Sequence, residues 1–203
     1  MALQVRIAVC EHGVGNVRSV VRAIEYAAPG ATVLHSNDPE VVRGADRIVV
    51  PGQGSFGAIV KALDGGLRDA LVAALRAGTP YLGICLGLQI LFDESDEAPG
   101  VRGLGVFRGR VRRLEVPLPL PHMGWNAVEP RGTGIERLGA LPAHFYFAHS
   151  YVAVPEEPDI IAATTDYGGP FVSAVARGNV LGVQFHPEKS QREGLGLLRR
   201  FFA

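Results

Sequence analysis

The sequence is short of cysteine, of net charge and of long apolar runs, and each shortage excludes a class of protein. Its 203 residues contain only two cysteines, Cys10 and Cys85, too few for a disulfide framework. Lys and Arg total 20, as do Asp and Glu, so composition does not predict a nucleic-acid-binding face. The uncharged stretch 77–92 includes Gly, Thr, Pro and Gln, and it is too short to span a bilayer. We therefore expect a cytoplasmic protein with no membrane or nucleic-acid partner.

The first half of the chain alternates apolar strand-like runs with amphipathic helical runs. The expected strands are residues 5–10, 31–35, 46–50 and 79–84, and the expected helices are 16–28, 66–77 and 86–92. This rhythm predicts an α/β fold with an open, mainly parallel sheet and flanking helices. Ligands of such sheets bind beyond the carboxyl ends of the strands.

After about residue 100 strand-like runs follow one another, which predicts antiparallel additions in the C-terminal half. These runs are residues 101–107, 109–115, 125–128, 145–148, 160–164 and 171–175. Residues 177–179 are expected to turn 172–176 back into 180–185 as a hairpin, and 191–202 to close the chain as a helix. No linker separates the halves, so we expect one domain over residues 1–203.

The segment GICLGLQ, residues 83–89, places a cysteine where a strand becomes a helix. Gly83 and Gly87 would leave room for a strained residue at the apex of such a turn, as in the G-x-S-x-G nucleophile elbow. Cys85 is therefore a candidate nucleophile. The alternative is a buried structural cysteine, which describes most free cysteines.

The segment VLGVQFHPEKS, residues 180–190, offers the partners that a thiol nucleophile needs. In an extended chain His186 and Glu188 would face the same side, so the carboxylate could hold one ring nitrogen and leave the other for the sulfur. A lone histidine here would more often be solvated or a satisfied core residue.

The segment PGQGSFG, residues 51–57, follows a predicted strand and could present backbone N–H groups to an oxyanion. The N–H of Leu86 at the expected helix start would supply a second donor. Seen alone, this segment would by default be a tight loop that needs positive φ angles.

Together, G-I-C-L-G-L-Q, F-H-P-E and P-G-x-G resemble the class I (triad) glutamine amidotransferases, which have a flavodoxin-like fold. More specific segments are similar to the glutaminase subunits of imidazole glycerol phosphate synthases. They are GVGNVRSV (13–20), PGQGSFG (51–57), HMGWN (122–126), YFAHSY (146–151) and GVQFHPEKSQ (182–191). The resemblance runs over the whole chain.

The resemblance implies a role for each matching position. Cys85 would attack the carboxamide of glutamine, His186 would transfer protons, and Glu188 would orient His186. Backbone at Gly52, Gln53 and Leu86 would form the oxyanion hole; the family commonly has a small aliphatic residue in place of Gln53. The implied glutamine pocket is Gly54, Gln89, Glu97, His149, Ser150 and Tyr151.

The resemblance also implies a partner, a (β/α)₈ cyclase subunit that receives the ammonia in a heterodimer during histidine biosynthesis. The implied contact residues are Asn16, Met123, Trp125 and Lys189. Trp125 is the only tryptophan, and an exposed tryptophan is a candidate interface anchor, although a core position would explain it as well.

Two alternatives to a cyclase-linked glutaminase remain open from the residues. One is a stand-alone triad hydrolase of γ-glutamyl amides, and the other is a non-catalytic module that kept the fold. No metal and no organic cofactor are expected, because the six histidines show no metal spacing with the cysteines and the Gly13-x-Gly15 segment lacks a third glycine.

Overall fold

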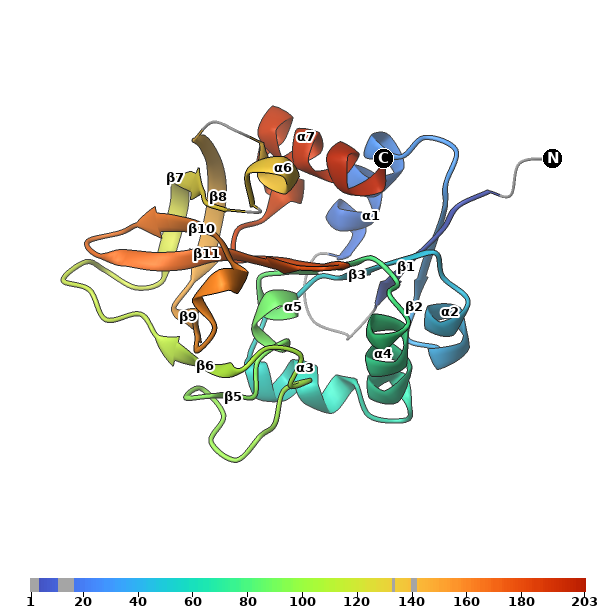
Figure 1. The fold of residues 1–203 in the computed structure, drawn as a ribbon, viewed down its shortest axis with the longest axis horizontal. Helices are drawn as coiled ribbons and strands as arrows, with labels where there is room; N and C mark the ends of the chain where they lie inside the picture. Colours follow the sequence, from blue (N-terminus) through green and yellow to red (C-terminus); the bar gives the residue numbers. More distant parts are fainter. Residues whose placement is uncertain (1–3, 11–16, 133, 140–141) are drawn as a thin grey trace.

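The fold is built on a mixed sheet whose first half is parallel (Figure 1). The computed structural model describes residues 4–10, 17–132, 134–139 and 142–203. Five strands lie side by side in the order β2-β1-β3-β4-β12, all parallel. Their bounds are Arg6–Cys10 (β1), Thr32–Ser36 (β2), Arg47–Val50 (β3), Tyr81–Ile84 (β4) and Val180–Val183 (β12). This order is flavodoxin-like and confirms the predicted fold class.

Four of the parallel strands, β1, β3, β4 and β12, contribute side chains to two cores, one on each face of the sheet. In β1, Ile7 and Val9 join one core, while Ala8 and Cys10 join the other. Helices α1 (Val17–Ala27), α6 (Gly134–Leu138) and α7 (Gln191–Phe202) cover the first face, the upper one in Figure 1. Helices α2 (Pro39–Arg43), α3 (Phe56–Ala62), α4 (Leu67–Arg76) and α5 (Leu86–Gln89) pack on the second.

The C-terminal half adds antiparallel strands next to β12, as predicted. Strands β11 (Pro170–Arg177), β10 (Ile161–Asp166), β7 (His122–Pro130) and β8 (Ala143–His149) extend the sheet in that order. The expected hairpin forms between β11 and β12, where Arg177 pairs with Val180. Off this path lie β5 (Glu94–Ser95), β6 (Gly109–Arg113) and β9 (Tyr151–Pro155), with short 3₁₀ turns at Pro158–Ile160 (η1) and Pro187–Lys189 (η2).

One predicted strand is wrong and one predicted helix is shorter than expected, and the same set of hydrogen bonds explains both. Residues 101–107 form an irregular loop rather than a strand, apart from one bridge between Arg102 and Glu94. Backbone N–H groups of this loop bind the carbonyls of residues 90–92, with Leu104 N donating to Ile90 O at 2.6 Å. Those carbonyls are thereby satisfied by the loop, and the helix predicted for 86–92 ends at Gln89.

Several short elements lie outside the predicted set, among them α2, α3 and β9. They have at most seven residues each, too few for a hydrophobic period to stand out. Across the described ranges, no helix is long and apolar enough to cross a membrane.

Candidate active site

Three neighbouring parallel strands bring the candidate segments to one edge of the sheet. Strand β4 lies between β3 and β12, with Gly83 beside Val50 and Ile84 beside Val183. The PGQG loop leaves the end of β3, Cys85 follows β4, and the segment to His186 follows β12. Parallel pairing therefore places residues from three distant parts of the chain at a single site.

Cys85 stands at the apex of a strained elbow between β4 and α5. Its backbone has φ +52° and ψ −103°, which a non-glycine residue seldom adopts. A Cβ added at Gly83 would lie 2.2 Å from the Gly87 carbonyl oxygen, and one at Gly87 would lie 1.8 Å from the Val50 oxygen. Both glycines are therefore required for the close approach of strand and helix. Tyr81 also closes the elbow, because its hydroxyl donates to the Gly87 carbonyl at 2.8 Å.

His186 and Glu188 form the expected pair, but the predicted geometry is wrong. Nδ1 of His186 lies 2.8 Å from Oε1 of Glu188, and their side chains are 2% and 3% exposed. The chain between them is not extended, since Glu188 lies in the 3₁₀ turn η2, which starts directly after His186. Ser190 Oγ donates to the His186 carbonyl at 2.6 Å, and His186 N donates to Tyr146 O at 2.8 Å. The turn and these hydrogen bonds position the imidazole of His186 against the carboxylate of Glu188.

The environment of His186 favours its protonated form. Burial by itself lowers the pKa of this imidazole, but Cys85 and Glu188 outweigh burial and raise the pKa to about 10. Nε2 is buried and has no well-formed hydrogen bond among the described residues, although Cys85 is near enough to influence the ring. Since Glu188 takes Nδ1, Nε2 is the nitrogen left to exchange a proton with Cys85 or a substrate.

A cavity of about 320 Å³ opens in front of Cys85 and His186. Gln53 and Leu86 of the predicted oxyanion hole line this cavity. All six residues predicted for the glutamine pocket line it too: Gly54, Gln89, Glu97, His149, Ser150 and Tyr151. Gly52 lies against the elbow, where an added Cβ would come within 2.3 Å of Leu86 Cβ. Pro121 and Ala148 also line the cavity and were not predicted.

Gln184 is a site residue that the sequence reasoning missed. It is fully buried, and its Nε2 lies 3.5 Å from Cys85 Sγ. Its Oε1 accepts from Gln89 Nε2 at 3.1 Å, and the same nitrogen of Gln89 donates to the Tyr151 carbonyl at 3.0 Å. A signal was present, because Gln184 is a polar residue in the apolar run VLGVQF, two positions before His186.

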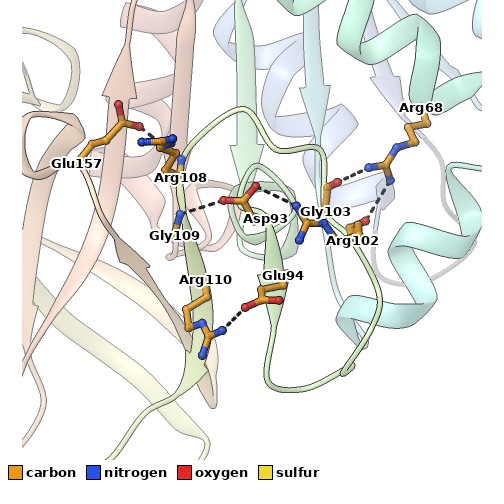
Figure 2. Close-up of polar contacts among 9 residues, drawn as sticks. All are labelled: Arg68, Asp93, Glu94, Arg102, Gly103, Arg108, Gly109, Arg110 and Glu157. Carbon is orange, nitrogen blue, oxygen red and sulfur yellow. Dashed lines mark hydrogen bonds and ion pairs between the residues drawn. The ribbon is translucent and has the colours of Figure 1, made fainter.

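Glu97 reaches the cavity from the loop between α5 and β6, and polar contacts hold this loop in place. Asp93 accepts from Gly109 N at 3.1 Å and pairs with Arg102 at 3.5 Å (Figure 2). Figure 2 also shows Arg68 donating to the carbonyls of Arg102 and Gly103, and Arg110 pairing with Glu94. The carboxylate of Glu97 then accepts from Phe56 N at 2.7 Å.

Two of the three described residues of the predicted partner face are exposed, and the third, Lys189, is half-buried. Met123 and Trp125 on β7 are 64% and 47% exposed. Trp125 packs edge-on against Tyr146, with ring centroids 6.3 Å apart, and the Lys189 ammonium lies 5.7 Å from the Tyr146 ring centre. The prediction for Asn16 lies outside the described residues. Within the described part of the chain, no group of three His, Cys, Asp or Glu side chains could hold a metal ion.

Known proteins match the chain over nearly its whole length. The family described as "Glutamine amidotransferase class-I" matches residues 8–203. The imidazole glycerol phosphate synthase subunit HisH of Nitrosomonas europaea is 46% identical over 96% of each chain, and that of Pyrococcus furiosus is 45% identical over 97% of each. A crystal structure of a glutamine amidotransferase superposes with a TM-score of 0.75 at 23% identity, covering 97% of this chain and 99% of that chain, a likeness of fold. The chain therefore belongs to the class-I glutamine amidotransferase family.

Proposed function

We propose that this chain is the glutaminase subunit of an imidazole glycerol phosphate synthase, and that residues 1–203 act as one domain. It hydrolyses glutamine to glutamate and ammonia and supplies the ammonia for histidine biosynthesis. The observation that carries the proposal is Cys85, held in a strained backbone conformation near a buried His186–Glu188 pair. The chain that carries it is 46% identical to a HisH subunit. A cytoplasmic location belongs to the proposal and is supported by two free cysteines.

In the first half of the proposed reaction, Cys85 attacks the carboxamide carbon of glutamine as a thiolate, with the neighbouring proton held on His186 Nε2. A carbon–sulfur bond forms, and the negative charge that develops on oxygen is stabilised by backbone N–H groups of Gln53 and Leu86. His186, which its environment keeps protonated, donates its Nε2 proton to the nitrogen. The carbon–nitrogen bond then breaks, releasing ammonia and leaving a glutamyl thioester on Cys85.

In the second half, His186 acts as the base. It takes a proton from water, whose oxygen attacks the thioester carbon, and the carbon–sulfur bond breaks to give glutamate and the free thiolate. Glu188 stabilises the imidazolium in both halves through its 2.8 Å bond to Nδ1. Glu97, half-buried and held at the start of α3 by its bond to Phe56 N, supplies a negative charge that suits the amino group of glutamine.

Its relatives are named as one subunit of imidazole glycerol phosphate synthase, which implies that this chain works with a second subunit. We propose that the other subunit is a (β/α)₈ cyclase that docks on the face bearing Met123, Trp125 and Lys189 and receives the ammonia. The exposure of Met123 and Trp125 supports this assignment, since tryptophan and methionine are enriched in interfaces.

The test is glutamate release from glutamine by the purified chain, alone and with the cyclase subunit plus its nucleotide ligand. Weak activity alone and strong activation by both additions are expected. High activity alone, with no response to the cyclase, would indicate a stand-alone hydrolase of γ-glutamyl amides. Absence of glutamate release in both conditions would contradict the glutaminase assignment.

A further inference from the structure

A chain of hydrogen bonds runs through the inner face of β7 to the glutamine pocket. His122 Nδ1 lies 3.1 Å from His149 Nε2, and His149 Nδ1 lies 3.1 Å from the Tyr151 carbonyl oxygen. At the other end, His122 Nε2 lies 3.3 Å from Asn126 Nδ2. Both histidines are at least 95% buried, so this chain is part of the protein interior.

The direction of each bond follows from the chemistry of its ends. The Tyr151 carbonyl only accepts, so His149 carries its proton on Nδ1 and, when neutral, accepts at Nε2. His122 must then donate from Nδ1 and accept at Nε2 from the amide of Asn126. The amide of Asn126 is itself oriented, because its Oδ1 accepts from Ala127 N at 2.8 Å and its Nδ2 donates to Asp166 O at 2.8 Å.

This assignment requires both imidazoles to be neutral. Burial lowers the pKa of His122 to about 4. Burial, followed by the neighbouring His122, lowers the pKa of His149 to about 3. A proton on either ring would place two N–H groups face to face or leave the Asn126 amide without its acceptor.

This series of hydrogen bonds ends at atoms that line the catalytic pocket. The Tyr151 carbonyl that accepts from His149 also accepts from Gln89 Nε2. Gln89 also donates to Gln184, whose amide nitrogen lies 3.5 Å from Cys85 Sγ. The position of His122 is thereby linked to the glutamine pocket and to the nucleophile through hydrogen bonds alone.

We propose that His122 is a positioning residue for glutamine binding, which acts through His149 to fix the Tyr151 carbonyl and Gln89. The inference rests on the proposed function and names a residue of β7 that does not itself line the cavity. The same strand carries Met123 and Trp125 on its opposite face. A shift of β7 when a partner docks on that face therefore reaches the pocket through His122.

The contacts of the His122 ring allow its shape to be separated from its hydrogen bonds. The ring stacks on Tyr167 and Phe147, with centroids 4.0 and 4.7 Å away. His122→Phe keeps an aromatic ring in this stack and removes both nitrogens. His122→Asn loses the stack but keeps an amide that can donate near the place of Nδ1. His35→Phe, at an exposed position of β2, is the matched control.

The experiment measures glutaminase kinetics of the complex with cyclase and nucleotide, and the ¹⁵N chemical shifts of the histidine rings. His122→Phe should raise KM for glutamine about tenfold, with a smaller change in kcat, as expected for the loss of one hydrogen bond that orders the pocket. His122→Asn should recover most of the wild-type KM, and His35→Phe should match wild type. The His149 shifts should show a single Nδ1–H tautomer in wild type and loss of the Nε2 hydrogen bond in His122→Phe.

Two results would overturn the positioning role. One is an active His122→Phe complex with wild-type KM, and the other is an Nε2–H tautomer of His149 in the wild-type chain. If His122→Phe does not fold, a wild-type KM in His122→Ala would overturn the role and a raised KM rescued in His122→Asn would support it. Failure of the proposed function has a different signature, since the wild-type complex itself would then release no glutamate.

Discussion

The imidazole of His186 and the carboxylate of Glu188 form a buried hydrogen bond of 2.8 Å, with both side chains at most 3% exposed. The bond occupies Nδ1 and leaves Nε2 for the thiol and the substrate. Because Cys85 and Glu188 raise the pKa of His186 to about 10, the ring is protonated before Cys85 attacks and holds the proton that the leaving nitrogen requires. This relationship makes Glu188 and Cys85 the first positions to test.

Replacing the nucleophile should abolish the reaction without disturbing the fold. Cys85→Ala removes the sulfur, so no thioester can form, and glutamate release by the complex should fall below detection. The elbow keeps its glycines, and binding of the cyclase should be unchanged. Glutamate release, circular dichroism and a binding titration measure these quantities. Wild-type turnover in Cys85→Ala would exclude this thiol as the nucleophile.

Glu188→Gln should reduce kcat about 100-fold, because the amide can fill the site but cannot stabilise an imidazolium as a carboxylate does. The pKa of His186 should also fall in this variant, since Glu188 is among the groups that raise it. Raising that pKa stabilises the wild-type fold fully below pH 6.5, and this contribution is lost as pH rises to about 10. The unfolding free energy, measured with urea from pH 6.5 to 10, should therefore depend less on pH in Glu188→Gln than in wild type. The same dependence on pH in both proteins would contradict the pairing.

Acid should destabilise the protein through the two neutral histidines. In the unfolded chain His122 and His149 take up protons near pH 6.5. In the native state burial lowers the pKa of His122 to about 4 and that of His149 to about 3, so protonation requires a lower pH. The urea midpoint of wild type should therefore fall as pH is lowered from 6.5 to 4. His122→Asn removes one of the two groups, so its midpoint should fall less. Parallel curves for the two proteins would contradict this explanation.

Trp125→Ala should weaken cyclase binding about 30-fold, a loss of about 2 kcal/mol that is typical of an aromatic anchor. Tyr26→Ala is the matched control, since Tyr26 is 62% exposed on α1, on a different part of the surface. Binding titrations measure both constants. Equal affinity of Trp125→Ala and wild type would remove Trp125 from the interface, and the glutaminase assay at saturating cyclase separates binding from chemistry.

The elbow should tolerate no side chain at Gly87. Gly87→Ala would place Cβ 1.8 Å from the Val50 carbonyl oxygen, so strand β3 and helix α5 must move apart. We expect a loss of more than about 3 kcal/mol in unfolding free energy, or no folded protein. Gly57→Ala is the matched control, because its Cβ would lie 3.5 Å from Ala98 Cβ, an ordinary contact. Equal urea midpoints for the two variants would contradict the close approach.

The sequence by itself determined the elements with strong local patterns and the residue types of the chemistry. The apolar runs of β1, β3 and β4 and the periodicity of α1 and α7 predicted a parallel sheet with helices, because burial on both faces requires them. Glycines around Cys85 predicted the elbow, because only residues without Cβ allow that approach.

Tertiary structure decided what depends on distant partners. Residues 101–107 have strand-like composition, but their N–H groups bind carbonyls of residues 90–92, which no local pattern predicts. Gln184 and His122 became site residues only when β12, β4 and β7 placed them beside Cys85 and His149. A hydrogen bond forms according to the distance and direction between its groups, and between residues about 100 positions apart the packing of the sheet sets both.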